Sequence, residues 1–354
     1  YIVPNSWMKN MMMSEVRRFM LDKLQILSIT PNLSNVFPDA SVDTMIFIAQ
    51  REVTGEAFEI NEFLNGKSII KHRTQQSRFL SSISLVFDVE STDEIATILD
   101  KVRANTFPIS NFFEITRGVN PYDKARGQSA EIISSQAYHA TFKKDETFVP
   151  EIRGRHVGRY FYQWDSEYYI SYGNWLAAAR EPRFFTGPRI VFREILGTNF
   201  VCTFINESII IDRSLYIALP KNEVIINSRY ALSLLGSKLM AYYFRYSNNE
   251  FDALFPKIRL SEFKELPIPS ITPAEQQPFI ALADELLTEH RALHEADATF
   301  AALLRAELGL AVPLTGKLAL GQEWKPWSTA LQKALGRPLT LAEKSEWLPH
   351  YTQH

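Results

Sequence analysis

The feature that most limits how this chain can fold is a long helical pattern near its end. Thr272-Pro273-Ala274-Glu275 has the spacing of a capping box, in which the threonine oxygen and the glutamate carboxylate each accept a free backbone amide. Gly309 and Pro313 end the pattern. Apolar residues recur at helical spacing at Phe279, Leu282, Leu286, Leu293, Phe300, Leu303 and Leu304. We therefore expect residues 271–354 to form a long spacer helix and a helical tail.

The composition excludes several classes of protein. The 354 residues are 46% hydrophobic and 22% charged, with 14 Gly and 18 Pro, which is typical of a globular chain and not of a disordered or collagen-like one. A single cysteine, Cys202, excludes an internal disulfide and Cys-rich zinc sites. No apolar run is long enough to span a membrane, and the chain begins at Tyr1 inside an apparent strand without a signal peptide. We expect a cytoplasmic protein, and a chain that is part of a longer one.

The first segment has the alternating pattern of an α/β domain whose first half is missing. We expect a strand end at Tyr1–Val3 and strands at Gln25–Thr30 and Val42–Gln50. Between them the spacing predicts a helix over Met13–Leu24. Its buried face would carry Val16, Phe19, Met20 and Leu24. Residues 1–90 are therefore expected to be the last strands and helix of a doubly wound sheet.

A domain boundary is expected near residue 105. Ser91-Thr92-Asp93-Glu94 has capping-box spacing and opens a helix to about Ala104, and Asn105-Thr106-Phe107-Pro108 breaks it. The sequence then changes to short strands, turns and aromatic residues, so an α+β domain is expected over residues 91–270. Inside it, one helix is predicted over Asn227–Tyr246. Its buried stripe would consist of Leu234, Leu235, Leu239, Tyr242 and Tyr243.

A cluster of arginines and aromatic residues gives the strongest indication of function. Residues 151–193 contain 11 aromatic residues, seven Arg and no Lys against four acids, whereas the whole chain has a net charge of −2. Arginine binds phosphates and guanine edges, and aromatic rings stack on bases. A packed core with arginines on its outer face explains the same composition equally well. The arginines are Arg153, Arg155, Arg159, Arg180, Arg183, Arg189 and Arg193.

Three short patterns are interpreted without assigning a site to them. His290 and His294 are four apart on the long helix, but no third metal ligand is evident, and a solvated helix face is the better interpretation. Asn120-Pro121-Tyr122 partly matches the tetrapeptide of amino-group methyltransferases, and a turn explains it better. Asp252, Glu262 and Lys264 follow the order of acids and lysine in metal-dependent nucleases, which leaves a nuclease as an alternative.

Taken in order, the segments resemble adenine-specific (N6) DNA methyltransferases, including type IIG restriction-modification enzymes with a TaqI-like C-terminal specificity domain. The catalytic part is matched by Tyr1-Ile2-Val3-Pro4-Asn5-Ser6-Trp7 and by Phe37-Pro38-Asp39-Ala40 with the strand after it. The specificity part is matched by residues 107–122, Ile152-Arg153-Gly154-Arg155 through Tyr172-Gly173-Asn174-Trp175, and Pro188–Arg193. Residues 234–239, Leu266-Pro267-Ile268-Pro269 and Glu275-Gln276-Gln277 also resemble specificity subunits of type I systems.

This resemblance implies a division of labour within a longer protein. The catalytic tetrapeptide and the S-adenosylmethionine loop of the family would precede Tyr1, so no catalytic, cofactor-binding or metal-binding residue is assigned to this chain. The chain would supply recognition of double-stranded DNA to a missing N-terminal catalytic half. Residues near turns are the expected DNA contacts, namely Arg117, Arg126, Arg153, Arg155, Tyr172 and Arg189. The alternative is a specificity subunit like those of type I systems, with no catalytic half.

Overall fold

The computed structural model divides the chain into two compact units. The residues it describes are 1–8, 10–33, 36–37, 43–51, 54–80, 85–89, 92–221, 225–247, 257–310, 318 and 323–352. Unit 1 consists of Tyr1–Phe107 and Leu239–Lys257, and unit 2 consists of Pro108–Lys238 and Ile258–His354. Each unit is therefore assembled from two separate stretches of sequence. The division into 1–90, 91–270 and 271–354 stays a prediction.

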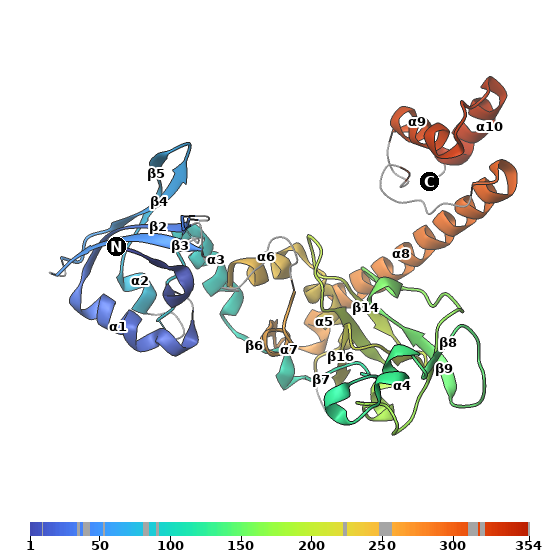
Figure 1. The fold of residues 1–354 in the computed structure, drawn as a ribbon, viewed down its shortest axis with the longest axis horizontal. Coiled ribbons are helices and arrows are strands. Elements are labelled where there is room, and N and C mark those ends of the chain that lie inside the picture. Colours follow the sequence, from blue (N-terminus) through green and yellow to red (C-terminus); the bar gives the residue numbers. More distant parts are fainter. Residues whose placement is uncertain are drawn as a thin grey trace. The chain divides into compact units, whose positions relative to one another are not determined.

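Unit 1 is built on a five-stranded mixed sheet of order β1-β3-β2-β4-β5 (Figure 1). Only the β2/β4 pair is parallel, and the other three pairings are antiparallel. Helices α1 and α2 lie on one face of this sheet. The elements are β1 (Ile2–Pro4), α1 (Ser14–Lys23), β2 (Gln25–Leu33), β3 (Thr44–Gln50), β4 (Phe58–Leu64), β5 (Lys67–Thr74) and α2 (Ser77–Leu80). The strands expected at Gln25–Thr30 and up to Gln50 are confirmed as β2 and β3.

The buried face of α1 differs from the predicted one. Arg17 and Leu21 are the buried residues, whereas Val16 and Phe19 are exposed. The Arg17 guanidinium donates to the carbonyl oxygens of Trp7 at 2.6 Å and Asn10 at 2.8 Å. Because these carbonyls supply the acceptors that a buried guanidinium needs, the arginine face can pack against the sheet. Hydrophobic spacing alone did not reveal this.

Helix α3 (Asp93–Arg103) follows the sheet and is capped one residue later than expected. The side chain of Thr92 accepts a hydrogen bond from the Ile95 amide at 3.4 Å, so Thr92 is the N-cap. Ser91, the expected cap, lies outside the described residues, as do Pro38, Asp39, Ala40 and Val42. The end of α3 at Arg103 agrees with the predicted break before Pro108.

Unit 2 contains two four-stranded sheets whose side chains share one hydrophobic core. The first sheet has the order β14-β13-β16-β7 and is antiparallel, and the second has the order β15-β9-β12-β8, with β15 and β9 parallel. Ile152 and Ile170 of the second sheet and Val191 and Ile217 of the first are fully buried in this core. The first sheet comprises β7 (Phe113–Arg117), β13 (Arg189–Arg193), β14 (Cys202–Ile205) and β16 (Leu215–Pro220). The second comprises β8 (His139–Ala140), β9 (Phe148–Ile152), β12 (Tyr169–Ser171) and β15 (Ile210–Ile211).

Shorter elements connect these sheets. The two-stranded hairpin of β10 and β11 leads toward the C-terminal helix, and α4 and α7 lie in connecting segments. Their bounds are β6 (Thr106–Pro108), α4 (Ala130–Ser134), β10 (Val157–Gly158), β11 (Phe161–Tyr162), α7 (Leu260–Lys264) and β17 (Pro267–Pro269).

The single helix predicted over Asn227–Tyr246 is wrong, because the structure contains two helices there. Helix α5 (Ser228–Leu235) ends at Gly236, and α6 (Lys238–Ser247) belongs almost entirely to unit 1. The expected buried stripe is also interrupted, since Leu239 is 54% exposed. Gly236 lies so close to Tyr160 that a Cβ atom there would be 2.1 Å from the tyrosine hydroxyl. The break between α5 and α6 therefore coincides with a close contact between Gly236 and Tyr160.

Helix α8 (Pro273–Leu308) confirms the long helix that the sequence predicts. Thr272 and Glu275 form the expected capping box, with hydrogen bonds of 2.9 and 3.3 Å between side chains and amides, and Gly309 ends the helix at φ 65°. The first half packs against the domain through Gln276 and Ala283, while Leu282 and Leu293 are largely exposed. The buried positions are therefore not the predicted leucines in this half.

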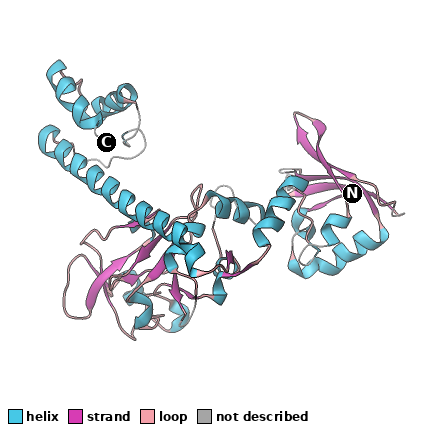
Figure 2. Ribbon diagram, turned by 180° about the vertical axis from the view of Figure 1, so that it is seen from behind, coloured by secondary structure: helices cyan, strands magenta, loops and turns pink. Residues whose placement is uncertain are grey.

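The tail forms a small helical core of its own. Helices α9 (Trp324–Leu335) and α10 (Leu341–Thr352) pack around Phe300 and Leu304 of α8, with Trp327 and Trp347 buried between them. Figure 2 shows strands and helices in both units. The elements described from Pro273 onward are the helices α8, α9 and α10. The expected mixed α/β fold with a helical C-terminal region is confirmed. None of the described helices is both long and apolar enough to cross a membrane.

Candidate nucleic-acid interface

Arg189, one of the six expected DNA contacts, is completely buried in β13. Its guanidinium donates to the carbonyl oxygens of Gly187 at 2.7 Å, Glu207 at 2.9 Å and Ile209 at 3.3 Å. Burial lowers the pKa of Arg189 to about 10, although Tyr162 and Glu207 nearby oppose this shift. This corrects the expectation of a surface contact: no edge of the guanidinium faces solvent, and Arg189 fastens the 207–209 segment to β13.

Arg153 and Arg155 meet around one aromatic ring, and we call Glu151, Arg153, Arg155, His139 and Tyr168 the Tyr168 cluster. The guanidinium carbon of Arg153 lies 3.9 Å from the Tyr168 ring centroid, and that of Arg155 lies 5.4 Å from it. A cation over the face of a tyrosine ring is attracted by the negative potential of that face. The ring therefore orders two arginines at once.

Buried side chains hold the Arg153 guanidinium on its inner side. Its Nε donates to Glu151 Oε2 at 3.3 Å, and its Nη2 lies 3.0 Å from His139 Nε2. The Glu151 side chain is 0% exposed and that of Arg153 is 29% exposed. Besides these two groups and the Tyr168 side chain, Arg153 has no carboxylate or carbonyl partner among the described residues, and part of its guanidinium side chain is exposed to solvent. A guanidinium fixed at its inner side can present its exposed part to a base or a phosphate.

The Arg155 side chain is more exposed than that of Arg153 and forms its ion pair with a different carboxylate. Its Nη2 lies 3.1 Å from Asp165 Oδ2, and the same oxygen lies 3.0 Å from His156 Nε2. The Arg155 side chain is 64% exposed. Burial, together with Arg155 and Arg153, lowers the pKa of His156, although Asp165 opposes the shift. His156 is therefore neutral at neutral pH and adds no charge to the cluster.

The segment Asn120-Pro121-Tyr122 supports these groups and has no ring free for a flipped base. The Tyr122 hydroxyl lies 2.8 Å from His139 Nδ1 and accepts a hydrogen bond from the Tyr138 amide at 3.0 Å. The Tyr122 ring stacks on Tyr138, and burial raises the pKa of Tyr122 to about 12. Asn120 forms a β-bridge with Ala178, so the expected simple turn is in fact an extended segment.

A second group of arginines surrounds the end of β7, and we call Arg117, Arg126, Arg180 and Arg213 the Arg180 cluster. Arg180 Nε donates to the carbonyls of Arg117 and Gly118 at 3.2 and 3.4 Å. Arg126 Nη1 donates to the Ala177 carbonyl at 2.9 Å. Arg117 and Arg126 were expected contacts, and the structure brings both to Arg180.

Burial lowers the pKa of Arg180, and the positive charges of Arg126 and Arg117 lower it further. Arg117 has an ion pair with Glu194, and Asp123 Oδ2 lies 3.8 Å from Arg126 Nε. Within the described chain, no carboxylate lies within ion-pair distance of Arg180. The cluster therefore contains positive charge that its own acids do not neutralise.

Tyr172, the remaining expected contact, belongs to the edge of the Arg180 cluster. Its hydroxyl donates to the carbonyl of Arg180 at 2.9 Å, and its ring packs edge-on against Phe185. Burial raises the pKa of Tyr172. Tyr172 thus shapes the backbone at Arg180, and part of its ring remains accessible.

One turn, Asp212–Ser214, connects the two clusters. Arg213 Nη1 donates to Asn120 Oδ1 at 3.2 Å on the side of the Arg180 cluster. Ser214 Oγ accepts a hydrogen bond from the Gly154 amide at 2.9 Å on the side of the Tyr168 cluster. Asp212 Oδ1 accepts from the Ser214 amide at 2.9 Å, which closes the turn. The clusters are therefore neighbouring parts of one surface.

The two α8 histidines pack against aromatic rings. The His294 ring stacks on Phe161 with centroids 3.6 Å apart, and His290 lies 5.7 Å from the Tyr160 ring. Burial, with Arg159 and His294 nearby, lowers the pKa of His290. The predicted solvated face is therefore partly covered. Among the described residues no group of three potential metal ligands is present.

The structure describes only some of the residues on which the nuclease alternative depends. Asp252 lies outside the described residues. The Glu262 carboxylate accepts a hydrogen bond from the Arg259 amide at 2.6 Å at the start of α7. This contact gives Glu262 a structural role at the helix N-terminus.

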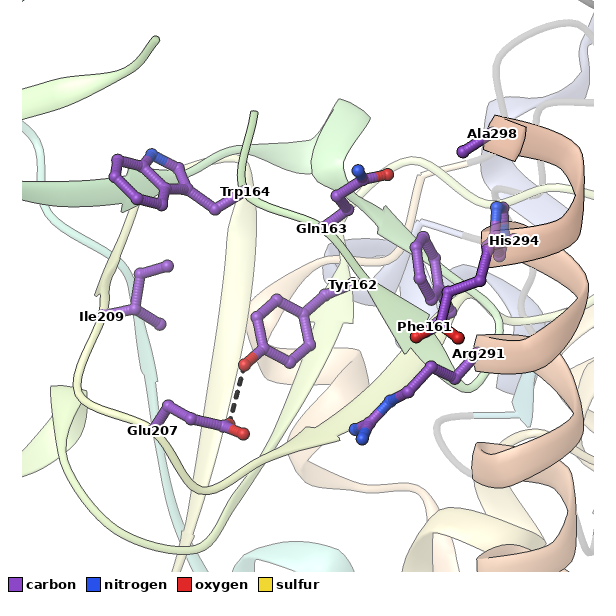
Figure 3. A pocket seen from close by; sticks show the side chains of 10 residues that line it. Phe161, Tyr162, Gln163, Trp164, Glu207, Ile209, Arg291, His294 and Ala298 are labelled. Atoms are coloured by element: carbon purple, nitrogen blue, oxygen red, sulfur yellow. Dashed lines mark hydrogen bonds between the residues drawn. The ribbon is translucent and has the colours of Figure 1, made fainter. Parts of the chain in front are cut away.

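A pocket of about 450 Å³ lies between β11 and α8 (Figure 3). The Tyr162 hydroxyl points to Glu207 and donates to its carboxylate at 2.7 Å, and Arg291 of α8 lies across the pocket. Glu295 of α8 also lines it. Two carboxylates face one guanidinium here. Because the charged lining is mostly negative, this pocket does not suit a phosphate group, in contrast to the two arginine clusters.

Sequence reasoning missed several residues of this surface. Glu151, His139 and Tyr168 are brought together by pairing of β8, β9 and β12, and nothing local in the sequence signals that pairing. Arg180 was recognised as one of seven arginines but not chosen, because no glycine or proline adjoins it. Arg213 has a local signal, since Asp212-Arg213-Ser214 is typical of an Asx turn.

Comparison with known proteins identifies two ranges of the chain that match family models. Residues 149–268 match the TaqI-like C-terminal specificity domain, and residues 272–354 match a domain of unknown function (DUF8810). A curated protein of Methanocaldococcus jannaschii, named as a type II restriction enzyme and methyltransferase, is 22% identical over 279 residues. That match covers 76% of this chain and 23% of the relative, so the chain spans about a quarter of the relative's length.

Restriction-modification proteins are among the solved structures that match this chain. The type IIL enzyme MmeI, solved in complex with DNA, has 13% identity and a TM-score of 0.49, covering 99% of this chain and 49% of that chain. The type IIG endonuclease BpuSI has 9% identity and a TM-score of 0.39, covering 80% and 42%. The HsdS subunit of Thermoanaerobacter tengcongensis has 13% identity and a TM-score of 0.34, covering 59% and 47%. Over residues 149–268, this chain is therefore similar to TaqI-like C-terminal specificity domains.

Proposed function

We propose that this chain recognises a specific sequence in double-stranded DNA for a restriction-modification enzyme. The observation that carries this proposal is the Tyr168 cluster, where the Arg153 guanidinium carbon lies 3.9 Å from the centroid of an aromatic ring and the side chain is partly exposed. The cluster begins at the end of β9, inside the matched specificity domain. A guanidinium held in this way suits the O6 and N7 atoms of guanine, which accept two parallel hydrogen bonds.

The contacts of Arg153 and Arg155 indicate how DNA recognition would proceed. Glu151 and His139 fix the inner side of Arg153, so little side-chain entropy remains to be lost when the outer end meets a base. Arg155 is more exposed and extends the same surface. Base contacts made by these arginines would set the register of the protein on the duplex. A target adenine would then be flipped toward a catalytic domain elsewhere in the longer protein.

The chemistry of that longer protein is a further part of the proposal. We propose transfer of a methyl group from S-adenosylmethionine to the N6 atom of adenine, as in the type IIG enzymes that the sequence resembles. No residue of this chain is assigned to the cofactor, because the sequence contains no GxGxxG loop. The buried thiol of Cys202 fits a reducing compartment such as the cytoplasm.

A specificity subunit without catalytic activity is the second candidate. Its supporting observation is the arrangement of one specificity domain followed directly by the 36-residue helix α8. The coding sequence before Tyr1 separates the two candidates. A catalytic tetrapeptide shortly before Tyr1 supports the methyltransferase, and a second specificity domain there supports the subunit.

The test of DNA recognition uses the full chain and a pool of random duplexes. Selection should yield a preferred sequence, and Arg153→Ala should lose about 1–3 kcal/mol for that duplex and relax the preference at one base pair. Arg337→Ala, in the helical tail and paired with Glu343, is the control and should leave both quantities unchanged. If the chain selects no sequence, or Arg153→Ala selects the same one with equal affinity, the proposal is wrong.

A further inference from the structure

We propose that the Arg180 cluster binds a backbone phosphate of the duplex, separately from the base-reading Tyr168 cluster. This inference rests on the proposed function, because it assumes that unit 2 binds DNA. It assigns a ligand, a phosphodiester group, to Arg180 and Arg213, which were not among the six expected contacts, and it gives Arg117 and Arg126 a role distinct from base recognition.

The guanidinium groups reach this site from three separate parts of unit 2. Arg117 ends β7, Arg126 follows a short turn, and Arg180 lies after the bridge between Asn120 and Ala178. Their planes are therefore not constrained to be parallel. The positive charges of Arg117 and Arg126 both act on Arg180. Charged donors that come from separate segments suit a tetrahedral phosphate, whereas a base edge requires donors in one plane.

Arg180 and Arg126 are each anchored to backbone carbonyls through one nitrogen. Arg180 uses only Nε for its two carbonyl acceptors, and Arg126 uses Nη1 for the Ala177 carbonyl. The terminal nitrogens of Arg180 have no partner within the described ranges. Arg180 itself has φ 65°, an uncommon conformation for a residue other than glycine. Its carbonyl accepts the Tyr172 hydroxyl, which holds this conformation in place.

The surrounding charges favour an anion. Glu194 is directed to Arg117 and also lies near Tyr216, to which Arg117 donates at 3.2 Å. Asp123 caps the turn before Arg126 by accepting the Ala125 amide at 2.9 Å. These two acids are engaged, and no described carboxylate pairs with Arg180 or Arg213. A phosphate would supply the missing negative charge.

The experiment measures the salt dependence of duplex binding by the full chain. Each phosphate neutralised by the protein contributes about −0.9 to the slope of log K against log salt concentration. Arg180→Ala and Arg126→Ala should each reduce the steepness by up to about one unit and weaken binding roughly ten-fold at low salt, equally for preferred and random duplexes. Arg180→Lys and Arg126→Lys should restore most of the slope, because they keep the charge.

Arg183→Ala is the matched control. Arg183 is close to Arg180 in sequence and 47% exposed, but it is fully engaged with Glu114 at 2.6 and 2.7 Å and with Glu181 at 2.8 Å. Its replacement should leave the slope unchanged. Melting curves of all variants confirm folding, and Arg126→Ala, at an exposed position, carries the test if Arg180→Ala does not fold.

The outcomes separate this inference from the proposed function. Wild-type slope in both alanine variants, an equal loss in Arg183→Ala, or a loss confined to the preferred sequence would each overturn the phosphate site while leaving DNA recognition intact. Absence of duplex binding by the unmodified chain would overturn the proposed function itself. Reduced slopes with unchanged sequence preference support the inference.

Discussion

Three of the seven arginines between residues 153 and 193 illustrate how different their surroundings are. Arg189 is buried among carbonyls, Arg183 is neutralised by two acids, and Arg153 lies over a ring and is partly exposed. The sequence predicted that arginines of this region gather on a surface, and for Arg153 the structure provides the geometry. The sequence could not distinguish the buried Arg189 from the other arginines, because the burial of β13 depends on strands that are distant in the chain.

The buried Arg189 leads to a prediction about stability. Arg189→Met keeps much of the apolar stem but leaves the carbonyls of Gly187, Glu207 and Ile209 without their donor. We expect the free energy of unfolding to fall by about 2–4 kcal/mol, measured by urea denaturation. DNA affinity of the folded variant should stay at the wild-type value. A variant of normal stability with weakened DNA binding would show that Arg189 is a contact after all.

Helices were predicted well where their signals are local and poorly where they depend on distant residues. The capping box at Thr272 and the glycine at the end of α8 are both local, and both were found. The division between α5 and α6 involves Tyr160, 76 positions earlier than Gly236, which no helical spacing reveals. For the same reason, α8 buries Gln276, whose amide donates to the carbonyls of Ile225 and Ile271 at 3.0 Å.

The close approach at Gly236 is testable by substitution. In Gly236→Ala the new Cβ would lie 2.1 Å from the Tyr160 hydroxyl and 2.6 Å from the ring carbon that bears it. We expect a loss of about 1–3 kcal/mol in unfolding free energy from overpacking. Gly197→Ala is the control, because the nearest atom there is an Asn199 carbonyl at 3.6 Å. Equal stability of the two variants would mean that the α5 end tolerates a side chain.

The tail should respond to acid through one glutamate. The Arg337 guanidinium and the hydrogen bonds from Thr340 lower the pKa of Glu343 from 4.5 to about 2. Because the folded pKa is lowered, this contribution to stability is present above pH 4.5 and is lost as pH falls toward 2. In that range the tail should loosen, and fluorescence of Trp327 and Trp347 should report it.

The matched variants for this pH effect lie on the same helix. Glu343→Gln should lose much of the pH dependence between 4.5 and 2, since it no longer titrates. Glu346→Gln, three residues later, should keep it. The same pH profile in all three proteins would exclude Glu343 as the responsible group.

At the scale of the whole molecule, the proposed DNA recognition depends on local charge and not on the total. The net charge is −2, yet the described surface of unit 2 gathers two groups of arginines around one turn. The sequence indicated the fold class and the specificity domain because they are encoded in ordered short motifs. It did not indicate that α6 leaves unit 2 for unit 1, because that assignment depends on which surfaces pack together.

Cys202 makes unit 2 observable on its own. It is the chain's single cysteine, lies in β14 and is 1% exposed, and burial raises the pKa of its thiol to about 12. Labelling by a thiol reagent therefore requires opening of unit 2. A duplex at 100 times its Kd should slow labelling about 100-fold when opening is rapid and reversible. The doubly substituted Arg126→Ala, Arg153→Ala chain should lose most of this protection, and identical rates with and without duplex would contradict binding to folded unit 2.

The Asp212–Ser214 turn sets a limit on how this surface can change. The Asp212 amide donates to the Ile152 carbonyl at 3.0 Å, and the Val119 amide donates to the Ile211 carbonyl at 2.8 Å, so backbone hydrogen bonds tie together the segments that carry the two arginine groups. On the proposed function, this connection sets the spacing of the two groups along the duplex. New sequence preferences can therefore arise by exchanging side chains around Tyr168. Lengthening the turn by one residue would shift the arginines around Tyr168 relative to those that contact the sugar-phosphate backbone and abolish recognition.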